Sequence, residues 1–240
     1  MANKISLNKT KTELIFFHKP RDKIPENYNF KLNGLKLKHS SHIKYLGIYL
    51  DETLNGAFQC SILASKLIRA NAMLSKIRHY VSQKDLISVY YSIFSSHMTY
   101  GCQIWGQNCS SNHFKKIARL KKKAVRIITF SGPIDHTEPI FKKLNRLKLK
   151  DNISLYNCLL IHDQTRNLLP SNFDGYFTPC SELYEADTRM AAGSLFIPSV
   201  QSQTYGRQSI KLSAIHTWNH LCETLNINLL SLSRFTLKKH

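Results

Sequence analysis

The sequence lacks several patterns that mark common classes of protein. It contains no run of about 18 apolar residues, so a membrane-spanning helix is not expected. The first residues, Met1 to Lys4, lack the apolar core of a secretory signal. The phosphate-binding glycine motifs G-x-G-x-x-G and the P-loop are missing, as is the G-x-S-x-G motif of serine hydrolases. We therefore predict an intracellular protein, in the nucleus or the cytoplasm, that is not secreted and has no membrane partner.

Acidic residues are scarce, with 15 Asp and Glu against 34 Lys and Arg, and no two Asp are adjacent. A magnesium-dependent polymerase or nuclease needs closely set carboxylates to hold its metal ions. Asp51-Glu52 is the only adjacent acidic pair in residues 1–130, and it favours a turn at the end of a strand. The residues by themselves predict binding chemistry, with no catalytic group, no metal site and no cofactor.

The six cysteines are scattered along the chain without paired spacing. Such a pattern is typical of free thiols in a reducing compartment.

The chain does have a large positive charge, +19 over 240 residues, and a hydrophobic content of 42% that excludes wholesale disorder. Residues 1–130 carry 22 basic and 6 acidic side chains, a balance of +16, whereas residues 131–240 are close to neutral at +3. A block this basic indicates a polyanionic partner. The alternative is that the basic surface serves only solubility.

The apolar patterns predict an α+β protein that is mostly α-helical. Residues 1–53 favour short strands forming a small antiparallel sheet, with a hairpin turn at Asn33-Gly34. A further strand is expected over residues 43–50, broken at Gly47 by a bulge or by a close approach of the backbone.

Residues 54–130 are predicted to form a basic helical region. An amphipathic stripe runs from Leu63 to Val81, and Ser82 with Asp85 can cap a second helix. We expect Tyr100-Gly101 and Trp105-Gly106 to interrupt the helical pattern.

A third helix, from about residue 112 to 130, places its charges on one face. At about 100° per residue, six cations occupy one side and the apolar residues the other. These cations are Lys115, Lys116, Arg119, Lys122, Lys123 and Arg126. Lys121 falls among the apolar residues, where it either snorkels or meets a partner. The cationic side is a phosphate-binding surface, a solvated surface or, least favoured, a membrane surface.

Residues 131–240 are predicted to be a helical tail with loops. Helices are expected from Thr137, over residues 151–166 and over residues 207–224, with long loops or edge strands over residues 171–205.

Several segments, in conserved order, resemble the region that follows the catalytic core of non-LTR (LINE-type, jockey/CR1-like) retrotransposon reverse transcriptases. The start resembles the stretch just after that core, and the next segment resembles the primer grip. Later segments resemble the thumb and tail. In order, the segments are residues 3–8, 11–13, 16–17, 42–51, 90–92, 100–101, 105–106, 120–128, 137–141, 188–189 and 209–219. Relatives often have Gln where this chain has Lys121.

The resemblance implies a palm-edge remnant over residues 1–53, a thumb over 54–130 and a tail over 131–240. Lys11 would correspond to a lysine near the phosphates of the incoming nucleotide. The primer grip would include Lys44 and the turn Tyr45-Leu46-Gly47. The thumb helices would follow the template–primer backbone through Lys66, Arg69, Lys76 and Arg78.

The family's metal-binding Asp motifs lie upstream of the region that this chain resembles, so Mg²⁺ would belong to those motifs. We therefore expect a part of an RNA-directed DNA polymerase that binds RNA or an RNA–DNA duplex without polymerising by itself. One alternative is a non-catalytic scaffold whose basic surface binds an acidic protein. Another is a chain that acts only together with an upstream palm polypeptide.

Overall fold

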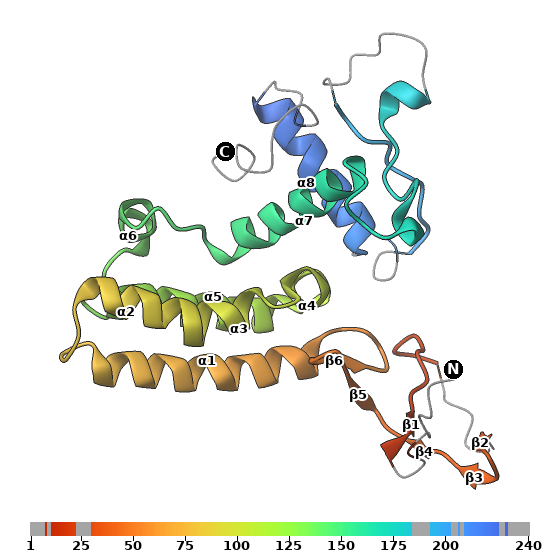
Figure 1. Ribbon diagram of the computed structural model, residues 1–240, viewed down its shortest axis with the longest axis horizontal. Coiled ribbons are helices and arrows are strands. Elements are labelled where there is room, and N and C mark those ends of the chain that lie inside the picture. The colour runs from red at the N-terminus through yellow and green to blue at the C-terminus, as the bar shows by residue number, and fades with distance from the viewer. Residues whose placement is uncertain are drawn as a thin grey trace, which may run out of the picture.

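The computed structural model describes residues 8, 11–22, 30–183, 193–202, 206, 209–225 and 229. Helices dominate the described chain, and short strands near the N-terminus extend from one end of the first long helix (Figure 1). The expected mostly helical α+β fold is confirmed. Residues 3–7 and 188–189, which contribute to the family resemblance, lie outside the described residues.

The strands form three separate pairs where a single antiparallel sheet was expected. β1 (Glu13–Leu14) pairs in parallel with β4 (Lys38–His39). β2 (Lys31–Leu32) and β3 (Leu35–Lys36) form the predicted hairpin at Asn33-Gly34. β5 (His42–Tyr45) and β6 (Ile48–Asp51) form a second antiparallel hairpin.

The expectation of one strand broken by a bulge at Gly47 is therefore wrong. Leu46 and Gly47 both have positive φ, at 46° and 86°, which is the geometry of a two-residue hairpin turn. The other half of that prediction is right, because a Cβ on Gly47 would lie 3.3 Å from the Tyr100 ring.

The first helical layer contains α1 (Ala57–Ile77) packed beside α5 (Ser111–Ile128). α2 (Gln83–Tyr90), the π-helical segment η2 (Tyr91–Ser95) and α3 (Ser96–Thr99) follow one another along this layer (Figure 1). The predicted cap is confirmed, since the Ser82 hydroxyl accepts a hydrogen bond from the Asp85 N–H at 3.2 Å. Leu67, Leu74, Leu86 and Phe94 are fully buried at the centre of this core.

The predicted interruption at Tyr100-Gly101 is confirmed, but the one at Trp105-Gly106 is wrong. Gly101 has φ 56° and precedes α4 (Cys102–Asn108), which runs through Trp105 and Gly106 as a continuous helix. A Cβ on Gly106 would lie 2.5 Å from Ile153 Cδ1. This glycine allows the close packing of two helices and does not end one.

The tail contains α6 (Thr137–Lys143), α7 (Leu149–Thr165) and α8 (Ile210–Leu225), with short 3₁₀ turns η3 (Ser171–Phe173) and η4 (Cys180–Glu182). α7 and α8 pack on each other around a second core that includes Trp218 and Leu195. The N-terminal turns of α7 belong to the first core through Leu149 and Ile153. α7 thus joins the two cores.

Candidate nucleic-acid interface

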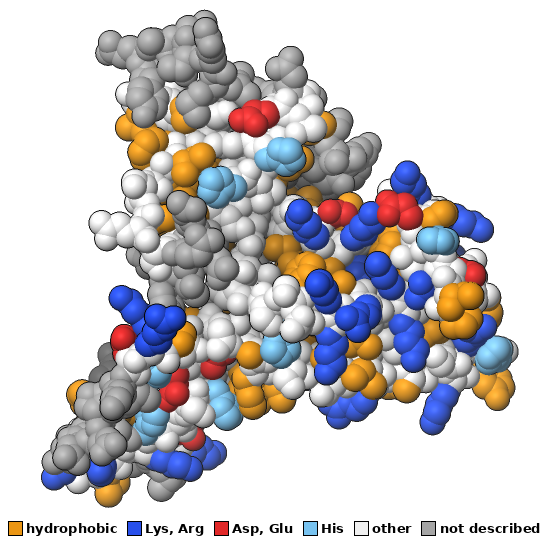
Figure 2. Space-filling view, turned by 180° about the vertical axis from the view of Figure 1, so that it is seen from behind, with side chains coloured by type: hydrophobic (Ala, Val, Ile, Leu, Met, Phe, Trp, Pro, Cys, Tyr) orange, Lys and Arg blue, Asp and Glu red, His pale blue; other side chains and the backbone are white. Residues whose placement is uncertain are grey.

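One side of α5 carries a row of basic side chains, which we call the cationic face. We define it as Lys115, Lys116, Arg119, Lys122, Lys123 and Arg126. The opposite side of α5 is buried through Ile117, Ala124 and Ile128. Burial of that side fixes the rotation of the helix, so its charges must face outward. Figure 2 shows Lys and Arg side chains gathered over this part of the molecule.

Within α5 no Asp or Glu offsets these charges. Five of the six cations are exposed, whereas Arg126 is half-buried. Arg126 Nε donates a hydrogen bond to the Asp135 carbonyl oxygen at 2.9 Å, which holds the guanidinium at the end of the face. Such a row of cations can contact several successive phosphates of one strand.

Lys121 lies on the buried side of α5, as its position in the helix predicts, and is only 3% exposed. Its Nζ lies 5.8 Å from the centroid of the Phe141 ring, so the ammonium meets an aromatic face. Burial lowers the pKa of Lys121 to about 8, although the nearby Asp151 carboxylate acts in the opposite direction. Among the described residues, no carboxylate lies within ion-pair distance of this amine.

The basic residues of α1 do not share the cationic face of α5. The Asn71 side chain donates to the Leu120 carbonyl oxygen of α5 at 3.0 Å. Lys66 lies about 140° around the helix from Asn71 and borders α3. Arg69 and Lys76 are exposed and lie about 60° and 80° around the helix from Lys66.

Arg78, which follows α1, packs over the Phe130 ring with its guanidinium carbon 5.1 Å from the centroid. Of the four cations predicted to follow one backbone, Lys66, Arg69 and Lys76 therefore lie on one side of α1, within about 80° of one another, and Arg78 lies apart from them over Phe130.

The turn at Tyr45-Leu46-Gly47 is held against the helical layer by Tyr100. The Tyr100 hydroxyl donates a hydrogen bond to the Leu46 carbonyl oxygen. Tyr45 and Leu46 themselves are 62% and 75% exposed, so the tip of the hairpin presents apolar side chains to the outside. A small cavity of about 270 Å³ beside it is lined by Gly47, Lys66 and His97 among others.

Lys66 of α1 and Gly47 of the predicted primer-grip turn thus line the same small cavity. Lys44 lies on the same hairpin, and its Nζ is 5.9 Å from the centroid of the Tyr49 ring. Lys11 is exposed before β1, where its backbone N–H donates to the Asn8 carbonyl oxygen.

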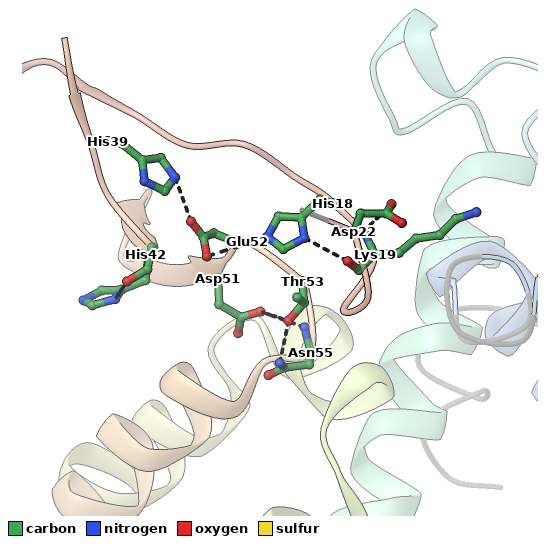
Figure 3. A network of polar contacts seen from close by, with 10 residues as sticks. His18, Lys19, Asp22, His39, His42, Asp51, Glu52, Thr53 and Asn55 are labelled. Carbon is green, nitrogen blue, oxygen red and sulfur yellow. Dashed lines mark hydrogen bonds and ion pairs between the residues drawn. The ribbon is translucent and has the colours of Figure 1, made fainter. Parts of the chain in front are cut away.

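The acidic pair Asp51-Glu52 has structural roles at the junction of β6 and α1 (Figure 3). Asp51 Oδ1 accepts hydrogen bonds from the Asn55 N–H at 2.8 Å and from the Thr53 hydroxyl at 3.3 Å. The Glu52 carboxylate contacts His39 Nε2 at 2.7 Å and His18 Nε2 at 3.7 Å. The predicted turn is confirmed, and Glu52 also ties the segment containing β1 and β4 to the start of α1.

Within the described ranges, no three His, Cys, Asp or Glu side chains gather as a metal site would require. No helix of the described residues is long and apolar enough to cross a bilayer. All six cysteines are free thiols, as predicted. Cys60 of α1 nevertheless contacts Cys109 at the end of α4, with 2.9 Å between the sulfur atoms.

About half of this chain is similar in sequence to polymerases of mobile elements. The chain is similar to part of a reverse transcriptase, and the predicted resemblance is confirmed on that basis. The probable RNA-directed DNA polymerase from transposon X-element of Drosophila melanogaster is 28% identical over 128 residues, which are 52% of this chain and 14% of that protein. The RNA-directed DNA polymerase from mobile element jockey of the same fly is 29% identical over 126 residues, 51% of this chain and 14% of that protein.

The matched region is therefore about one seventh of the length of these curated relatives, 14% in each case. No protein-family model matches the chain. No solved structure matches it either.

Three features of the folded chain have no counterpart in the sequence-based predictions. They are the contact between Cys60 and Cys109, the π-helical segment at Tyr91, and the position of Arg146 beside that segment. Each depends on a contact between residues distant in sequence or on a local change of helical pitch. Neither a distant contact nor a local change of pitch produces a periodic pattern in a single sequence.

Proposed function

We propose that this chain is a nucleic-acid-binding part of a retrotransposon RNA-directed DNA polymerase, and that its cationic face binds the phosphates of a template–primer duplex. The observation that carries the proposal is the cationic face itself, six basic side chains on one side of α5 with no acid among them. Both relatives are RNA-directed DNA polymerases by name, which supports RNA and DNA as the polyanions.

The hairpin tip supports the same function at a second position. Exposed Tyr45 and Leu46 can pack against the sugar or base at a strand end, while Lys66 supplies a charge beside them. Binding would be tolerant of sequence, because contacts to phosphate and sugar carry no base information.

We infer that the chain does not polymerise DNA by itself, because its sequence contains no adjacent pair of Asp to hold two metal ions. Primer extension with Mg²⁺ tests this directly. Extension of a labelled primer by the purified chain would refute the inference. Extension only after addition of a separate palm polypeptide would support a role joined to that partner.

The duplex proposal is tested by a salt titration with a labelled RNA–DNA hybrid. Each neutralised phosphate contributes about 0.7–0.9 to the slope of log K against log salt. A face of six cations predicts a slope as steep as roughly −5. A flat slope would exclude phosphate binding as the source of affinity.

The decisive variant replaces four exposed cations of this face, Lys115, Arg119, Lys122 and Lys123, with Glu. The matched control makes the same change of charge on exposed residues near the N-terminus, Lys19, Arg21, Lys31 and Lys38. We expect the first variant to lose hybrid binding with its melting temperature retained, and the control to keep most of its affinity. Equal losses would mean that net charge, and not the cationic face, determines binding.

An acidic protein is the competing type of partner. Competition between the RNA–DNA hybrid and poly-glutamate distinguishes the two. Displacement of the hybrid by equimolar poly-glutamate would favour the scaffold alternative, since a row of phosphate contacts should prefer the nucleic acid.

A further inference from the structure

A large cavity lies on the other side of α5 from the cationic face. Its volume is about 1060 Å³, and it is bounded by η2, the loop between α6 and α7, and the helices α7 and α8. Lys121 reaches it from α5. The helical position of Lys121, about 120° from that of Lys115, separates this cavity from the cationic face.

The lining of the cavity carries a net positive charge. Lys121, Arg146 and Lys150 line it, whereas Asp151 is the single carboxylate among the described lining residues. Lys121 keeps its ammonium away from water against the face of the Phe141 ring. The Asp151 carboxylate is near this buried charge but beyond ion-pair distance, so an anion entering the cavity would offset part of the cost of burying the ammonium.

The lining also contains an aromatic platform. Tyr91 is 38% exposed, and the Arg146 guanidinium lies 4.7 Å from its ring centroid. Behind it, the Tyr90 ring meets Tyr91 edge-on at 5.5 Å and stacks on Phe94 at 5.3 Å, so the platform rests on the core.

Tyr91 is also the first residue of the π-helical segment η2. π-helical turns are rare and frequently lie at functional sites. Here the widened turn aims Tyr91 and Ser95 at the cavity.

We propose that this cavity binds a segment of single-stranded nucleic acid. An unpaired base stacks on the Tyr91–Arg146 platform, and the adjoining phosphates contact Lys121 and Lys150. Aromatic faces with flanking cations are the usual means of holding single strands, whereas a duplex hides its base faces. The inference rests on the proposed function and adds a second, separate site for the unpaired part of the template.

The experiment uses the full chain, a fluorescein-labelled 12-nucleotide oligouridine and a labelled blunt RNA–DNA hybrid. Loss of one base stack predicts that Tyr91→Leu weakens oligouridine binding about 5- to 150-fold. Tyr91→Phe is the matched control, and it should bind within about 2-fold of the native chain because it retains the ring. Arg146→Gln changes an exposed side chain and should also weaken oligouridine binding, which keeps the test informative if Tyr91→Leu is poorly folded.

Hybrid binding separates the two proposals. The cavity variants Tyr91→Leu and Arg146→Gln should leave the affinity for the hybrid unchanged. The variant with four Glu substitutions on the cationic face should lose that affinity. If the hybrid binds but oligouridine does not, or if neither Tyr91→Leu nor Arg146→Gln weakens oligouridine binding, the cavity inference is wrong while the duplex proposal stands. If oligouridine binds through the cavity and the hybrid does not bind, the duplex proposal fails alone. Binding of neither overturns both.

Photocrosslinking distinguishes direct contact of Tyr91 with the nucleic acid from a purely structural role of this residue. An oligomer containing 5-iodouridine should crosslink to Tyr91, and mass spectrometry of the digested product locates the modified residue. Crosslinks confined to α5 or to the β5–β6 hairpin would place the single strand elsewhere and overturn the inference.

Discussion

Replacement of Lys121 by Met should stabilise the protein. Met keeps the length and apolar character of the side chain and removes the buried ammonium, so the contact with Phe141 is retained. The ordinary pKa of a lysine is 10.5, and burial lowers that of Lys121 to about 8. At about 1.4 kcal/mol per pKa unit, the charged form costs the folded state roughly 3 kcal/mol.

The sign of the pH dependence follows from proton binding. Below about pH 8 the amine is protonated in both states, so the whole cost is present and Lys121→Met gains most. Between about pH 8 and 10.5 the unfolded chain binds a proton that the folded chain has released, so the native protein gains stability as the pH rises. The advantage of the variant should therefore decrease over this range and vanish above it.

Urea denaturation of both proteins at pH 7 and above pH 10 measures the difference in the free energy of unfolding. Lys122→Met is the matched control, because Lys122 is exposed on the same helix and its replacement should change stability by less than about 0.5 kcal/mol. A loss of stability in Lys121→Met at pH 7, or a gain that does not depend on pH, would refute this reasoning. The variant should also bind oligouridine more weakly, so that stability and single-strand binding change in opposite directions.

Two further predictions concern a close approach and a thiol. Gly101→Ala should cost more than about 2 kcal/mol by calorimetry, since its Cβ would lie 2.2 Å from Ile48 Cδ1 at a φ of 56°. Gly175→Ala has a similar φ of 66° with open space around it, so it should cost only about 1–2 kcal/mol, and equal losses would contradict the clash. Cys109 should be the first thiol alkylated by iodoacetamide, because it is half-exposed and the hydrogen bond from Cys60 lowers its pKa. Cys60→Ala should slow that labelling, and uniform labelling of the six cysteines would exclude the effect.

Much of the helical region could be predicted because its signals are local. The stripe that begins at Leu63, the Ser82 cap and the two faces of α5 each depend on residues within a few turns of one another, although α1 ends at Ile77 and does not reach Val81 as predicted. Periodicity and capping report such features directly. Even the exceptional Lys121 could be identified from its position on the helix.

The predictions that failed or were incomplete involve distant contacts. The residue type of Gly106 suggests a break, yet its role is to admit Ile153 of another helix. Leu46 adopts a φ of 46°, which is unusual for leucine, and its carbonyl oxygen accepts a hydrogen bond from Tyr100 more than 50 residues away, so the turn at Leu46-Gly47 has no local signal in the sequence. The strand pairings near the N-terminus are too short for alternation to specify their order.

The candidate site divides in the same way. The sequence by itself determined that the chain is basic in its first part and that six cations share one face of α5. It also determined the resemblance to a reverse transcriptase. Charge, helical period and sequence similarity are all properties of the linear chain. Only the tertiary structure decided that the cations of α1 point away from the cationic face of α5. It also decided that Lys66 meets the β5–β6 turn, and that Tyr91, Lys121 and Arg146 line one cavity. The physical reason is that side-chain direction between elements is set by packing, and packing depends on all the elements at once.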